Sequence, residues 1–146
     1  MGKKAFALDQ VLNYRSEVEK VCRLEFASAK QRFEGACARL EDDENSVSLL
    51  DSEFLDRQWA GMPATELQMY SDFFQRKKND LMQQRQQVDL LNSKMTEQRE
   101  VLIDAARDKK VLENLKDKKV KAHARELLDK ERIFLEELSL QKRGAR

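Results

Sequence analysis

Residues 60–63 read Ala-Gly-Met-Pro, and they are the only stretch of this 146-residue sequence with the chemistry of a tight turn. A helix-start signal follows at once, because residues 65–68, Thr-Glu-Leu-Gln, have the form of a capping box in which Thr65 and Gln68 satisfy free backbone amides. Between Met62 and Lys142 there is no glycine and only one proline, Pro63. The pattern predicts that the chain reverses direction here and that a long helix follows.

The sequence before the turn has the apolar spacing of one amphipathic helix. Apolar residues recur in steps of three and four, with a break at Arg15, and Gly35 lies inside the pattern without ending it. An acidic and polar cluster at residues 41–46 predicts a kink or fraying near Ser46. The spaced residues are Leu8, Val11, Val18, Cys22, Phe26, Ala29, Phe33, Ala36 and Leu40.

After the turn a second set keeps strictly alternating steps of three and four, a period of 3.5 that predicts a left-handed coiled coil. We therefore expect an all-α fold, a long antiparallel two-helix coiled-coil hairpin in a single domain. The expected boundaries are a helix at about 5–58, a turn at about 60–65 and a helix at about 65–142. The second set is Val88, Leu91, Met95, Gln98, Leu102, Ala105, Lys109 and Leu112.

The second helix is predicted to overhang the first. With the apex near Gly61, residue i faces about residue 121 minus i, so that Leu8 lies opposite about residue 113, where the second seam also ends. About 30 residues, or about 45 Å of helix, then project alone. This tail either binds a partner along a rotated apolar stripe, pairs with a second copy, or orders only when bound. The stripe consists of Ala124, Leu127, Leu128, Leu135 and Leu138.

Composition argues against several functions. Charged residues make up 38% of the chain but sum to a net charge of only +1, which gives no general attraction to nucleic acid or anionic lipid. A two-helix hairpin has no interior for a substrate pocket, and no glycine-rich phosphate loop occurs, so we expect no enzyme and no cofactor. Cys22 and Cys37 lie about 22 Å apart on one helix and are expected to be reduced thiols. His123 is the only histidine, so no metal site is expected.

Two local anomalies suggest partner surfaces. Residues 107–125 hold eight Lys or Arg against three Asp or Glu, which is either a solvated helix face or a docking face for an acidic protein. Five aromatics gather around the turn, either as a small core that closes the tip or as a partner site, and there are too many for all of them to be buried. They are Phe54, Trp59, Tyr70, Phe73 and Phe74.

Two stretches resemble the FliJ family, the soluble component of the bacterial flagellar type III export apparatus. They are residues 6–15, FALDQVLNYR, and residues 105–119, AARDKKVLENLKDKK. The resemblance extends over nearly the whole chain by length and layout. It implies a non-enzymatic stalk, similar to the coiled coil of the γ subunit of rotary ATPases, that is inserted in the hexameric export ATPase. It also implies contacts with the cytosolic domain of the membrane export gate and with export chaperones that it escorts.

The resemblance also implies a location and two surfaces. The protein is expected in the cytoplasm, peripherally associated with the inner-membrane export apparatus, monomeric when free, and needed for flagellum biogenesis and motility. The gate- or chaperone-facing surface is expected around Leu40, Tyr70 and Phe73. The face around Lys77, Asp80 and Gln84 is polar where the family pattern implies an apolar contact. The ATPase-ring-facing residues are expected to be Arg107, Lys109, Lys110, Lys116, Lys118 and Lys119.

Two other functions stay open from the residues. One is an export chaperone that holds flagellar substrates on the apolar stripe of the tail. The other is the equivalent stalk of a virulence type III secretion system, which the physics of the sequence does not separate from the flagellar stalk.

Overall fold

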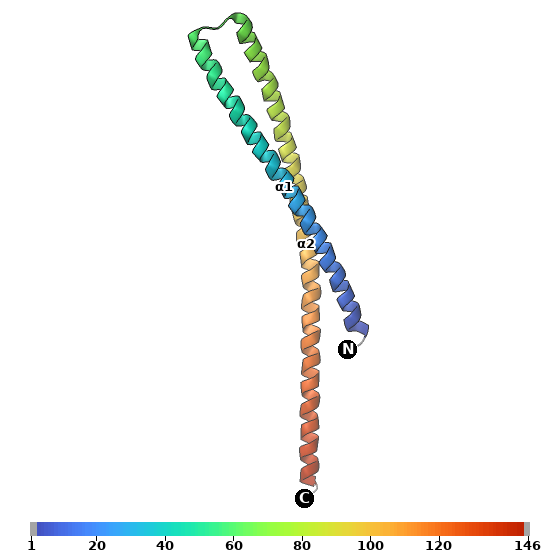
Figure 1. Cartoon of the computed structure of the whole chain (residues 1–146). Helices are drawn as coiled ribbons and strands as arrows, with labels where there is room; N and C mark the ends of the chain where they lie inside the picture. Colours follow the sequence, from blue (N-terminus) through green and yellow to red (C-terminus); the bar gives the residue numbers. More distant parts are fainter. Residues whose placement is uncertain (1–2, 145–146) are drawn as a thin grey trace. The chain divides into compact units, whose positions relative to one another are not determined.

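The computed structural model describes the backbone of residues 3–144 and the side chains from Leu8 onward, and it consists of two helices. Helix α1 spans Lys3–Ala60 and helix α2 spans Ala64–Gly144, with residues 61–63 as the link (Figure 1). No strand occurs within the described residues. The predicted all-α fold class is confirmed.

The chain divides into two compact units. The hairpin unit, residues 21–102, contains the end of α1, the turn and the first half of α2. The terminal unit, residues 1–20 with 103–146, contains the start of α1 and the second half of α2.

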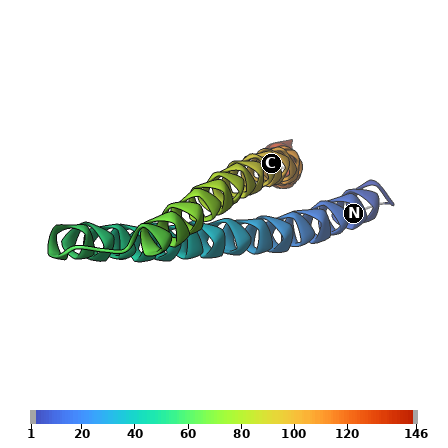
Figure 2. The ribbon, with the colours of Figure 1, turned by 90° about the horizontal axis from the view of Figure 1, so that it is seen from above.

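The turn depends on glycine and proline in different ways. Gly61 has φ 98°, and its amide donates to the carbonyl of Gln58 at 3.3 Å, which ends α1 in the left-handed conformation that glycine tolerates best. Pro63 directly precedes α2, where its missing N–H costs nothing, and its carbonyl accepts the Leu67 amide at 3.1 Å. Figure 2 shows the resulting link between the two helix ends.

The predicted capping box is wrong. Helix α2 begins at Ala64, one residue before Thr65, so Thr65 is already helical and is not in the N-cap position. The side-chain amide of Gln68 donates instead to Asp72 Oδ1 at 3.1 Å, one turn further along the same helix.

The predicted kink near Ser46 is also wrong, because α1 is continuous through residues 41–50. The like-charged cluster is tied across to α2 inside the hairpin unit. Glu44 pairs with Arg85 at 3.2 Å, and Gln84 donates to Asp43 at 2.6 Å. These contacts offset the mutual repulsion of the carboxylates.

The two helices bury one shallow seam. In the hairpin unit the predicted α2 seam residues from Val88 to Leu102 are all half-buried or buried, and Met95 is 8% exposed. Cys22 is buried and Cys37 half-buried, and both are free thiols. No described side chain has less than 2% of its surface exposed, since two helices alone cannot enclose one.

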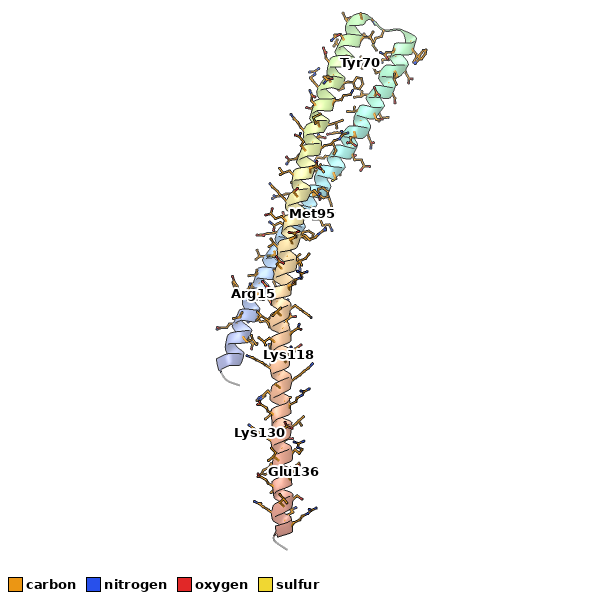
Figure 3. All side chains as sticks on the ribbon, turned by 180° about the vertical axis from the view of Figure 1, so that it is seen from behind. Arg15, Tyr70, Met95, Lys118, Lys130 and Glu136 are labelled. Atoms are coloured by element: carbon orange, nitrogen blue, oxygen red, sulfur yellow. The ribbon has the colours of Figure 1, made fainter. Side chains whose placement is uncertain are left out.

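In the terminal unit the seam continues through Ala105, Lys109 and Leu112, and Lys116 is its last half-buried residue. On α1, Val11 is 45% exposed and Leu12 is half-buried, so the seam passes through Leu12 and the prediction for Val11 is wrong. Residues 117–144 are exposed on every face, which confirms the overhanging helix, about 42 Å long. Lys130 and Glu136 project from it beyond the start of α1, with no second helix beside them (Figure 3).

The predicted register is displaced by several residues. Asp9 pairs with Lys116 in the terminal unit and Asp43 with Gln84 in the hairpin unit, where the expected register gives about residues 112 and 78. The link occupies residues 61–63, so the apex lies after Gly61 and each α1 residue meets a later residue of α2. Arg57 and Tyr70, the hydrogen-bonded pair nearest the turn, show the same displacement.

Gly61 and Gly35 give a matched test of the turn. Replacing Gly61 by alanine forces a Cβ into positive φ and is expected to lower the free energy of unfolding by about 1 kcal/mol. Gly35 lies inside α1, and a Cβ there meets no atom within 4 Å, so Gly35→Ala is expected to raise it by about 0.5–1 kcal/mol. Urea unfolding followed by circular dichroism measures both. Stabilisation by both substitutions would contradict the assigned role of Gly61.

Candidate partner-binding surfaces

The basic face of α2 divides into free and engaged cations. Arg107, Lys110, Lys118 and Lys119 are exposed and form no ion pair or hydrogen bond among the described side chains of the terminal unit. Lys109 and Lys116 are half-buried against α1. The six residues predicted to face the ATPase ring therefore do not form one uniform exposed surface.

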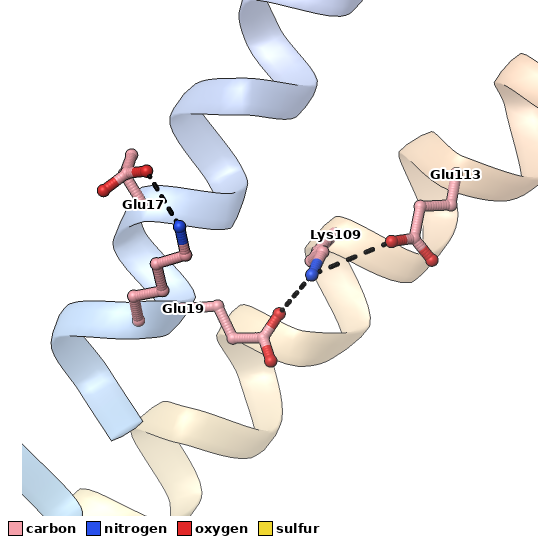
Figure 4. Close-up of polar contacts among 5 residues, drawn as sticks. Glu17, Glu19, Lys109 and Glu113 are labelled. Atoms are coloured by element: carbon pink, nitrogen blue, oxygen red, sulfur yellow. Dashed lines mark hydrogen bonds and ion pairs between the residues drawn. The ribbon is translucent and has the colours of Figure 1, made fainter. Parts of the chain in front are cut away.

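Lys109 is part of a partly buried ionic cluster. Its Nζ lies 3.2 Å from Glu19 Oε2 on α1 and 3.8 Å from Glu113 Oε1 on its own helix (Figure 4). The Glu19 side chain is only 9% exposed, and Glu19 is the one buried charged residue among those described. A carboxylate at such a position needs a cationic partner, because burial without one is strongly unfavourable.

Two further ion pairs join the same segment of α1 to α2. Lys116 Nζ lies 2.8 Å from Asp9 Oδ1, and Arg15 Nη1 lies 3.5 Å from Asp108 Oδ2. Their side chains are between 41% and 57% exposed, so solvent screens both pairs. Three charged residues of this segment, Asp9, Arg15 and Glu19, thus each pair with an oppositely charged residue of α2.

The spacing of residues in the sequence also indicates that Glu19 belongs to the seam. From Leu8 to Leu40 a strict alternation of steps of four and three passes through Leu12, Arg15, Glu19 and Cys22. The predicted apolar set contains Val11 and Val18 instead, and these two residues do not fit the alternation. Spacing locates the seam better than residue type where charged groups belong to it.

The aromatic residues near the turn form a compact cluster in the hairpin unit. The ring of Phe54 lies 5.1 Å from that of Tyr70 and 5.5 Å from that of Phe74, while Phe73 and Phe74 are 6.1 Å apart. The Arg57 guanidinium donates to the Tyr70 hydroxyl. These distances are typical of favourable ring pairs, so the cluster joins the two helices beside the turn.

The residues predicted to face the gate are not all in one place. Tyr70 and Phe73 belong to the aromatic cluster, and Lys77 Nζ lies 5.6 Å from the centre of the Phe73 ring. Leu40 is half-buried on α1, one turn beyond Glu44, whose partner Arg85 is about 22 Å along α2 from Tyr70. The structure therefore does not bring Leu40 to Tyr70 and Phe73.

Part of the apolar surface near the turn is exposed, as expected. Trp59 is 90% exposed and Met69 is 70% exposed. An open groove of about 890 Å³ also runs between the helices, with Phe54, Leu67 and Phe74 among its lining residues. Polar and apolar residues line this groove alike. A protruding aromatic ring such as that of Trp59 is typical of a protein-binding surface.

The overhanging tail carries a second exposed apolar surface. Leu127 is 50% exposed, and Leu128 and Leu135 are each 64% exposed. His123, on the same part of the helix, is also exposed. Among the described residues no three His, Cys, Asp or Glu side chains converge as metal ligands, and neither helix has a stretch apolar enough to cross a membrane.

These features define a class of protein: an all-helical chain whose candidate binding surfaces are exposed charged and apolar helix faces. The chain belongs to the flagellar FliJ protein family, whose model, described as "Flagellar FliJ protein", matches residues 3–145. Its members are non-enzymatic components of the flagellar export apparatus. The family match favours the flagellar apparatus over a virulence secretion system.

No curated protein and no solved structure matches the chain. The side chains of Phe6 and Ala7, in the first resembling stretch, lie outside the side chains that the structure describes.

Two aromatics near the turn separate stability from binding. Phe54→Ala removes a half-buried ring with two ring partners and is expected to lower the free energy of unfolding by about 1–2 kcal/mol. Trp59→Ala removes an exposed ring and is expected to change it by less than about 0.5 kcal/mol. Urea titrations of both variants test this, and an equal loss in the two would mean that Trp59 packs against the cluster.

Proposed function

We propose that this chain is a stalk-like adaptor that couples the flagellar export ATPase to the membrane export gate and escorts export chaperones. The observation that carries the proposal is the basic segment of α2, where four cations are exposed within and just beyond the part paired with α1. Exposed cations on a rigid helix suit an acidic protein surface, because their charge steers association and their positions set its register. Family membership supplies the apparatus in which such a surface acts.

The two surfaces suit separate partners. The basic face belongs to the terminal unit and engages the ATPase hexamer, whereas the surface around Trp59, Met69 and Tyr70 belongs to the hairpin unit and engages the cytosolic domain of the gate or a chaperone. In this proposal the protein works in the cytoplasm, at the periphery of the inner-membrane apparatus. It needs no nucleic acid and no membrane insertion.

The ATPase contact is tested by pull-down with a variant that changes only free cations. Replacing Arg107, Lys110, Lys118 and Lys119 by alanine leaves Lys109 and Lys116 in place, so the pairing of α1 with α2 is retained. We expect binding to the ATPase to weaken about tenfold or more, and binding to the soluble gate domain to stay unchanged.

A matched control removes the same charge from the hairpin unit. Arg32, Arg76, Lys78 and Lys94 are exposed and form no ion pair among the described residues. Their replacement by alanine is expected to leave ATPase binding within about twofold of the wild type. If both variants bind the ATPase as the wild type does, the basic face is a solvated surface and the stalk proposal loses its support.

The exposed leucines of the tail favour a second candidate function, that of a chaperone for unfolded export substrates. Amide exchange of residues 124–138 separates the two functions, since only a bound partner can cover these side chains. The stalk proposal predicts slower exchange when the export ATPase is added. Slowing by a flagellar substrate but not by the ATPase would establish the chaperone function in its place.

A further inference from the structure

The first turns of α1 occupy part of the basic face. Asp9 and Glu19 place their carboxylates on Lys116 and Lys109, the two of the six basic residues that lie on the side of α2 facing α1. An acidic protein approaching the face offers the same chemical group. The start of α1 and such a partner therefore bind the same two ammonium groups.

Ion pairs make up part of the attachment of this segment. Three of its contacts with α2 are ion pairs, and the side chains of two of these pairs are more than 40% exposed. Its apolar contribution comes from Leu8, Leu12 and Val18, which are only half-buried. Exposed ion pairs are weak and are screened by salt, so this segment opens more readily than the apolar seam of the hairpin unit.

We propose that residues 8–20 of α1 shield Lys109 and Lys116, and that an acidic protein surface competes with Asp9 and Glu19 for them. The inference builds on the proposed function, because it concerns the same basic segment of α2. Arg107, Lys110 and Lys118 lie on the side of α2 away from α1, and release of the α1 segment exposes two further lysines on the opposite side of the helix. The start of α1 thus limits the affinity of α2 for acidic partners.

The test uses the full-length chain and poly-glutamate as the acidic probe. The variant Asp9→Asn with Glu19→Gln removes both shielding carboxylates and keeps their size. The control Glu17→Gln with Glu25→Gln changes the net charge by the same amount. Glu17 pairs only with Lys20 of its own helix, at 3.3 Å, and Glu25 is exposed.

We expect the shielding variant to bind poly-glutamate about three- to tenfold more tightly than the control at low salt. An equal gain in the two variants would show only a general charge effect and would overturn the proposal. Weaker binding by the shielding variant would also overturn it, because residues 8–20 would then belong to the binding surface.

Amide hydrogen exchange of the wild-type chain measures directly whether residues 8–20 are displaced from α2. Poly-glutamate is expected to speed the exchange of residues 8–20 and to leave residues 21–40 unchanged, because the latter belong to the hairpin unit. Slower exchange of residues 8–20 would contradict competition. Both measurements are made without the ATPase, so a failure of the ATPase pull-down and a failure of this inference are distinguishable.

Discussion

Two paired helices can shield only one narrow stripe of each other, and the rest of this structure follows from that constraint. Among the described residues, the buried hydrophobic side chains are those of Cys22, Leu81, Met95 and Ala105. None of them is fully enclosed. Stability is therefore spread along the seam as many partial burials, with no dense centre. Such a seam tolerates polar members, because a side chain there can reach solvent at its edge. Lys109 and Glu19 are two such polar residues of the seam.

Much of the fold follows from spacing in the sequence. The 4-3 steps of α2 located its buried residues from Val88 to Leu112, and the glycine and proline of the link located the reversal. The errors arose where local chemistry was preferred to spacing or to tertiary contacts. Thr65 had capping chemistry but lay inside a helix that began earlier, and two of the carboxylates near Ser46, those of Asp43 and Glu44, were bound by Gln84 and Arg85, about 40 positions away.

The candidate surfaces were only partly predictable for a related reason. The excess of cations at residues 107–125 and the aromatic cluster near the turn are properties of composition, so they were visible in the sequence. Which cations are free depends on what α1 places opposite them, and this depends on the register. The link sets the register, and a displacement of a few residues determines whether Asp9 meets Lys116 or an uncharged neighbour.

The three-residue link also restricts how such a chain can change in length. Adding one residue to a helix rotates everything beyond it by about 100°, which would carry the seam away from its partner helix. Seven residues restore the facing side almost completely, because they complete nearly two turns. An insertion in one helix also has to be matched in the other, or every charge pair beyond it meets the wrong neighbour. Viable length variants of the paired part therefore differ by paired heptads, and the length of that part is adjustable only in increments of about 10 Å.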